Sequence, residues 1–231
     1  SEPTPFPLNK PVGTSGYNAP AFGDLDLDGD LDLLIGVLGG AYNPNSTTID
    51  NFLRLDQTGP LSFDRRTARF IEGIDVGSES FPALADPDGD GDLDLFLGNK
   101  IETDDPDSGR LYWFENIGTP TEPRLQARGL SGLAGAFHFA PAFGDLDADG
   151  DEDIMLGAWG DELATLWNEG PADTPSGSEV GRDLLGETGT EHRIGGARYV
   201  VGDPVAVTIM RGRNTTPTLG DIDGDGDLDL F

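Results

Sequence analysis

Four acidic segments with one spacing constrain this chain more than any other feature. Each has the form D-x-D-x-D-G-x-x-D, begins at Asp24, Asp86, Asp145 or Asp221, and runs directly into a short apolar segment. Each also has a proline four residues before its first aspartate, at Pro20, Pro82, Pro141 and Pro217. Five carboxylates within nine residues repel one another unless they stay in water or share a cation. Four matches with shared flanks favour a metal-binding repeat over a merely solubilising acidic surface.

The donor types in these segments favour calcium. Aspartates at positions 1, 3 and 5 with glycine at position 6 match the start of a calcium loop, where glycine allows a sharp turn. Oxygen ligands without Cys or His favour a hard cation over zinc or copper. An EF-hand would place Glu at position 12, but the first copy has Ile35 there. The carboxylate at position 9 is therefore expected to close the loop, with the backbone carbonyl of Asp30 as a ligand at position 7.

We accordingly predict up to four Ca²⁺ sites, one in each acidic loop. The candidate metal ligands are all the aspartates of the four segments: Asp24, Asp26, Asp28, Asp30, Asp32, Asp86, Asp88, Asp90, Asp92, Asp94, Asp145, Asp147, Asp149, Asp151, Asp153, Asp221, Asp223, Asp225, Asp227 and Asp229.

Short apolar runs bounded by glycine indicate an all-β fold. LDLLI, LDLFL and EDIML follow the first three acidic segments, as expected of buried strands. Further strands are predicted at 52–55, 61–65, 69–73, 111–114, 123–128 and 164–167. The 34 glycines and 17 prolines in 231 residues leave little room for long helices. Four strands in each period of about 60 residues predict a β-propeller of four-stranded antiparallel blades.

The segment FGDLDLDGDLDLLIG resembles the FG-GAP or VCBS repeat, which forms the calcium-loop blade of integrin-α-like β-propellers. RLYWFENIGTP (110–120) and ELATLWNEGP (162–171) resemble the second strand and turn of bacterial members. The resemblance covers nearly the whole chain and is weakest between residues 172 and 202. It implies that each calcium loop leads into, or lies beside, the innermost strands of a blade.

The whole chain, 1–231, is expected to form a single, partial propeller. Repeat cores are predicted at 20–36, 82–98, 141–157 and 217–231, with a longer loop insertion at 171–189. The N-terminal segment aligns with the last strand of a blade, and Phe231 lies inside the first strand of another. We therefore expect three full blades plus two cut ones. A cut inner strand without a neighbour would expose an apolar edge, which soluble proteins avoid. Missing chain or another subunit would complete the ring.

Charge and composition limit the partners and the setting. The net charge of −29 disfavours nucleic acid and anionic membranes as partners, because both require basic patches. No transmembrane run or signal peptide is recognisable, and without cysteine there is no disulfide framework. Extracellular calcium modules bind at roughly 10⁻⁴ to 10⁻³ M, a level absent from cytosol. We expect an extracellular, cell-surface or periplasmic location and a protein or glycan partner.

No catalytic arrangement is recognisable in the sequence. His138 and His192 have no recognisable nucleophile in their neighbourhood, and the chain lacks cysteine and the G-x-S-x-G motif. Asp161 and Glu162 have nothing to set them apart from other acids. The sequence therefore predicts a protein that is not an enzyme and acts as an interaction, adhesion or scaffold module with structural calcium.

An alternative function is carbohydrate binding, as a lectin-like propeller or the non-catalytic domain of a polysaccharide-degrading enzyme. Tryptophans can stack on sugars, although a place in the core between blades is more usual for this repeat; the chain has Trp113, Trp159 and Trp167. Loop residues Tyr42, Asn43 and Asn45 are the candidate rim contacts.

Overall fold

β-Strands make up every regular element in the part of the chain that the computed structural model describes. The described residues are 18–36, 52–66, 76, 78–101, 109–119, 122–134, 138–157, 163–171, 189, 191–194, 197–202 and 215–231. The strands are β1 (Ala19–Gly23), β2 (Asp32–Gly36), β3 (Phe52–Gly59), β4 (Ser62–Arg66), β5 (Ser78–Ala85), β6 (Asp94–Ile101), β7 (Arg110–Asn116), β8 (Leu125–Ala134), β9 (Ala140–Gly144), β10 (Asp153–Gly157), β11 (Ala164–Pro171), β12 (Glu191–Ile194), β13 (Ala197–Val201), β14 (Leu219–Gly220) and β15 (Asp229–Leu230). The prediction of an all-β chain is confirmed for these residues.

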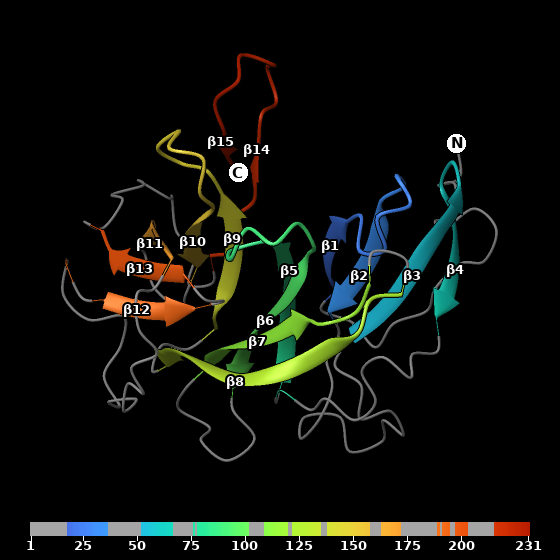
Figure 1. The fold of residues 1–231 in the computed structure, drawn as a ribbon, viewed down its shortest axis with the longest axis horizontal. Helices are drawn as coiled ribbons and strands as arrows, with labels where there is room; N and C mark the ends of the chain where they lie inside the picture. Colours follow the sequence, from blue (N-terminus) through green and yellow to red (C-terminus); the bar gives the residue numbers. More distant parts are fainter. Residues whose placement is uncertain are drawn as a thin grey trace.

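Three antiparallel sheets and a short hairpin follow one another along the chain (Figure 1). Their strand orders are β1-β2-β3-β4, β5-β6-β7-β8, β9-β10-β11 continued by β13 and β12, and β14-β15. Each begins with a strand that pairs antiparallel with the strand after the acidic loop. Every acidic loop is therefore the turn of a hairpin. In the three larger sheets the first strand also contains the repeat proline, which a strand at the edge of its sheet tolerates.

The first strand of each hairpin is an addition to the strands predicted from the sequence. The expected strand at 69–73, the N-terminal cut blade and most of the 171–189 insertion lie outside the described residues. The third sheet departs from the four-strand expectation because it has five strands. There β13 pairs with β11 in the fourth place, and β12 adds a fifth strand that also contacts β8 of the preceding sheet.

The hydrophobic core lies between successive sheets. On β6, Leu95 and Leu97 join a buried cluster with Leu34 of the first sheet, whereas Phe96 joins a cluster with Ile154 of the third. Both faces of β6 are thus covered, which explains its continuous apolar run. The first strands contact one another in order, β1 with β5, β5 with β9 and β9 with β14. Sheets stacked through their faces around neighbouring first strands are consistent with blades of a β-propeller.

The glycine at position 13 of the first three repeats is a point of close approach between sheets. An ideal Cβ would lie 2.0 Å from the Ser80 carbonyl oxygen at Gly36, 2.2 Å from that of Phe139 at Gly98, and 2.1 Å from that of Thr215 at Gly157. The repeat proline of the following sheet packs at the same points, through the Cδ atoms of Pro82, Pro141 and Pro217. These two repeat residues therefore serve the contact between sheets.

A second contact between sheets pairs the residue before each acidic loop with position 8 of the next loop. Gly23 leaves room for Leu93, whose Cδ1 would lie 2.9 Å from an added Cβ, and Gly144 likewise leaves room for Leu228. In the remaining interface the glycine is replaced by Ala85, and the leucine by a glutamate. The Glu152 carboxylate there accepts a hydrogen bond from the backbone N–H at position 1 of the second loop, at 2.8 Å.

Candidate metal centres

The same hydrogen bonds shape all four acidic loops. The carboxylate at position 1 accepts hydrogen bonds from the backbone N–H groups at positions 5 and 6, over 2.9 to 3.2 Å. The carboxylate at position 5 accepts one from the N–H at position 7, over 3.0 to 3.1 Å. In the first loop these acceptors are Asp24 and Asp28. Each loop thus closes through its own aspartates, as short polar side chains do in turns.

Two positions of every loop have left-handed backbone. Position 6 has φ of +93° at Gly29, +93° at Gly91, +101° at Gly150 and +98° at Gly226, as the sequence predicts. Position 4 has φ of +53° at Leu27, +70° at Gly89, +62° at Ala148 and +76° at Gly224. Sequence reasoning missed position 4, although glycine in two of the four copies was a signal. The other two copies hold L residues in a conformation that costs them about 1–2 kcal/mol.

The loops bring three carboxylates together in each copy. In three loops the acids at positions 1, 3 and 5 offer oxygens that all lie within 4.8 Å of one another: Asp24, Asp26 and Asp28; Asp86, Asp88 and Asp90; Asp221, Asp223 and Asp225. In the third loop the group comprises Asp145, Asp147 and Asp153, so position 9 takes part. The predicted ligands at position 7, Asp30, Asp92, Asp151 and Asp227, lie outside these groups.

The aspartate at position 9 also connects the hairpin to the third strand of its sheet. Its side chain is buried and accepts a hydrogen bond from a backbone N–H: Asp32 from Gln57 at 3.3 Å, Asp94 from Asn116 at 2.8 Å and Asp153 from Asn168 at 2.8 Å. Loss of this hydrogen bond would leave the buried carboxylate and the backbone N–H without partners, which costs free energy. Position 9 is therefore a structural link in these three sheets.

Burial and like charge raise the pKa values of several loop carboxylates. Burial raises the pKa of Asp92 to about 6, with the charges of Asp90 and Asp86 adding to the effect. Burial raises the pKa of Asp94 to about 7, although hydrogen bonds from Asn116 and Trp113 oppose the shift. The ionised loop is therefore electrostatically unfavourable by itself, and an opposite charge among these oxygens would favour ionisation.

The residues present fit a hard divalent cation. Every donor in the clusters is a carboxylate oxygen, the ligand type that Ca²⁺ prefers. Buried carboxylate oxygens without a hydrogen-bond partner within the described part of the chain include Oδ1 of Asp26 and Oδ1 of Asp92. Buried acceptors of this kind are normally satisfied, so they mark positions where a cation would supply the missing interaction. The geometry is compatible with calcium.

Comparison with known families agrees with the repeat seen in the loops. Residues 86–156 match the model of a family described as the FG-GAP-like repeat. This stretch of the chain is similar to the FG-GAP-like repeat. It runs from position 1 of the second loop through β10 and so includes the second and third acidic loops. No curated protein matches the chain. The resemblance seen in the sequence is confirmed for these residues.

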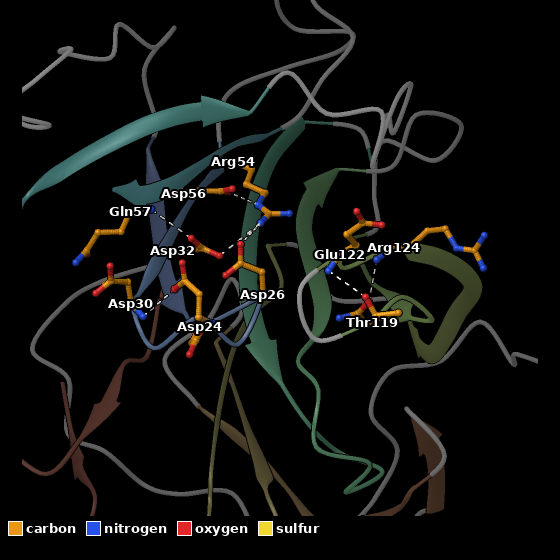
Figure 2. A network of polar contacts seen from close by, with 12 residues as sticks. Asp24, Asp26, Asp30, Asp32, Arg54, Asp56, Gln57, Thr119, Glu122 and Arg124 are labelled. Carbon is orange, nitrogen blue, oxygen red and sulfur yellow. Dashed lines mark hydrogen bonds and ion pairs between the residues drawn. The ribbon is translucent and has the colours of Figure 1, made fainter. Parts of the chain in front are cut away.

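The first acidic loop, residues 24–32, lies outside that stretch and has an arginine beside its acids (Figure 2). Arg54 of β3 is buried, and its guanidinium lies among three carboxylates. Nη2 is 3.6 Å from Oδ2 of Asp26 and 3.6 Å from Oδ2 of Asp32, and Nε donates to Oδ1 of Asp56 at 2.6 Å. Burial raises the pKa of Asp32 to about 6, and the charge of Asp56 adds to this, whereas Arg54 lowers it. Sequence reasoning did not assign Arg54.

A second polar group lies at the opposite end of β5 and β6 from the acidic loops. The Lys100 ammonium is 2.9 Å from the Glu79 carboxylate, and the His138 ring packs against Phe81 with centroids 4.4 Å apart. His138 is 4% exposed, and neither ring nitrogen has a hydrogen-bond partner among the residues described. Burial lowers the pKa of His138 to about 4. This is the environment of a packed, neutral histidine.

The tryptophans that the structure describes take part in packing. Trp113 packs against the core between the second and third sheets and donates its indole N–H to Asp94 at 2.7 Å. Trp167 lies against Gly202, where an added Cβ would meet the indole nitrogen at 2.3 Å. His192 is in β12, and its side chain is not among the described features. The remaining candidates fall outside the described residues: Tyr42, Asn43, Asn45, Trp159, Asp161 and Glu162.

Proposed function

We propose that this chain is a calcium-stabilised β-propeller that acts as a non-catalytic interaction or scaffold module outside the cytosol. The observation that supports it is the repetition of one loop geometry in four copies. All four have the same carboxylate hydrogen bonds and a cluster of three acids. A solubilising acidic surface would not need its oxygens convergent, because dispersed carboxylates lie lower in electrostatic energy.

The loops are placed where a bound cation would stabilise the whole stack of sheets. Each loop joins two strands that contact the neighbouring sheets, for example β5 with its repeat proline and β6 with its position-13 glycine. A bound Ca²⁺ would supply the positive charge that offsets repulsion among the acids at positions 1, 3 and 5. Since closure of the hairpin and packing between sheets are coupled, binding would add to the free energy of folding.

The proposed setting and partners follow from the same chemistry. Sites of the extracellular class fill at roughly 10⁻⁴ to 10⁻³ M calcium, which supports an extracellular, cell-surface or periplasmic location. The net charge of −29 favours a protein or glycan partner over nucleic acid. Among the described residues, no helix has the length and hydrophobicity that a membrane span requires.

Thermal unfolding with calcium or with EDTA tests this function. At about ten times Kd, each site adds about 1.4 kcal/mol, so four sites raise the midpoint by about 10–20 °C. Mg²⁺ at the same ionic strength should restore little of the loss, because it demands a smaller octahedral site. Asp86→Asn should lower the midpoint in calcium more than Glu122→Gln, a change at an exposed acid outside the loops. Equal midpoints in calcium and EDTA, with no metal detected in the protein, would refute the proposal.

A further inference from the structure

Arg54 occupies a place that has no cation in the neighbouring sheets. Trp113 and Thr165 hold the corresponding places in the second and third sheets. Each lies opposite the residue at position 11 of its own repeat: Arg54 opposite Leu34, Trp113 opposite Phe96, and Thr165 opposite Met155. Trp113 gives its position-9 aspartate a neutral N–H donor, and Thr165 has no charge. Of the three sheets whose third strand is described, the first alone places a positive charge behind its acidic loop.

The guanidinium acts on the carboxylates that the loop needs for closure and for cation binding. It is 3.6 Å from Asp26, the position-3 acid of the cluster, and 3.6 Å from Asp32, the acid at position 9. Both contacts lie in a region where Arg54 is only 7% exposed, so solvent screens them weakly.

The same charge has two opposite effects on the first loop. It offsets repulsion among the acids and so reduces the loop's need for an added ion, although the nearest partner of Arg54 is Asp56, whose own charge adds to that repulsion. It also repels a divalent cation at the Asp24–Asp26–Asp28 cluster, and it forms an ion pair with the Asp26 carboxylate of that cluster. Both effects reduce the difference in stability between the loop with calcium and the loop without it.

We propose that Arg54 is a built-in counter-ion that makes the first loop, residues 24–32, largely independent of calcium, whereas the second and third loops depend on it. This inference rests on the proposed calcium function and deepens it. These three loops then form two classes, and a change in calcium concentration alters the second and third loops while the first keeps its shape.

Hydrogen–deuterium exchange with mass spectrometry tests this in the intact chain, because peptides report on each loop separately. On replacing calcium with EDTA, amide exchange in peptides covering 86–94 and 145–153 should accelerate about tenfold or more, while 24–32 changes less than about twofold. Equal acceleration in all three loops would overturn the inference and leave the calcium function standing. No acceleration in any loop would instead contradict the calcium function itself.

Substitutions at Arg54 then assign the effect to its charge. Arg54→Gln should make exchange in 24–32 as sensitive to calcium as in the other two loops, and Arg54→Lys should preserve the wild-type pattern. Arg198→Gln is the control, because Arg198 forms ion pairs with Glu169 and Glu191, neither of which belongs to an acidic loop. If Arg54→Gln does not fold in EDTA, its exchange is measured across a calcium titration, where Arg54→Lys must need less calcium. Identical calcium responses of the Gln and Lys variants at 24–32 would refute the role of the charge.

Discussion

The position-13 glycine of the second repeat offers a direct test of how the sheets contact one another. Gly98 lies at the end of the apolar run on β6, and an ideal Cβ there would be 2.2 Å from the carbonyl oxygen of Phe139 and 3.0 Å from Cδ of Pro141. The first obstacle is backbone of the next sheet, which cannot rotate away as a side chain can. Gly98→Ala should therefore push the second and third sheets apart.

The expected cost follows from the displacement. To bring the added methyl group to an ordinary contact distance near 3.4 Å, the two sheets must move apart by about 1 Å. Overpacking a tight core by one methyl group costs about 1–3 kcal/mol. The adjacent hydrogen bond from the Phe139 N–H to the Asn99 carbonyl, at 2.9 Å, would weaken by about 1 kcal/mol. Reduced freedom of the unfolded chain returns about 0.4–1 kcal/mol. The net loss is about 2 kcal/mol, or about 4–8 °C in the midpoint for a chain of this size.

Thermal unfolding in saturating calcium, followed by circular dichroism, measures this loss. Gly220→Ala is the matched control, because Gly220 also lies in a strand but has nothing within 4 Å of its ideal Cβ. That variant should unfold within about 2 °C of the wild type, since no atom opposes the added methyl group. If Gly98→Ala and Gly220→Ala unfold at the same temperature, the close contact between sheets does not limit stability and the reasoning fails.

Two further predictions concern the left-handed position 4 and the buried histidine. Ala148→Gly should stabilise the protein by about 0.5–1 kcal/mol in urea unfolding and Gly89→Ala should destabilise it by about 1 kcal/mol; equal and unchanged midpoints would contradict the strain. Burial lowers the pKa of His138 from 6.5 to about 4, so between these values the unfolded chain binds more protons than the folded one. The contribution of His138 to stability should thus fall by about 3 kcal/mol as the pH drops through this window. His138→Asn, which tolerates the positive φ, should remove that part of the acid sensitivity; parallel pH profiles of variant and wild type would contradict it.

The local design of the acidic loops was predictable because their interactions span only a few residues. Carboxylates at positions 1 and 5 bond to N–H groups two to five residues further along, so the spacing of Asp24, Asp28 and Gly29 carries the necessary information. The all-β class was equally accessible, since short apolar runs between glycines report strand burial directly. Position 4 was missed because two of its four residues, Leu27 and Ala148, are types that seldom adopt left-handed backbone.

The roles that depend on distant partners emerged only in three dimensions. Spacing predicts Asp32 as a metal ligand, and only the structure shows that it also accepts a hydrogen bond from the backbone of Gln57 on another strand of the sheet. The fifth strand of the third sheet, β12, joins through pairing with β13, in a region where the repeat pattern fades.

The sequence by itself determined the acidic loops, the family resemblance and the β-rich class, because these rest on local spacing and periodicity. Tertiary structure alone decided that Gly98 and Pro141 meet between sheets, that Glu152 takes the place of a leucine beside Ala85, and that Arg54 reaches the first loop. The physical reason is that packing and charge act through space. Residues far apart in the chain acquire their roles only when the fold brings them within a few ångströms of one another.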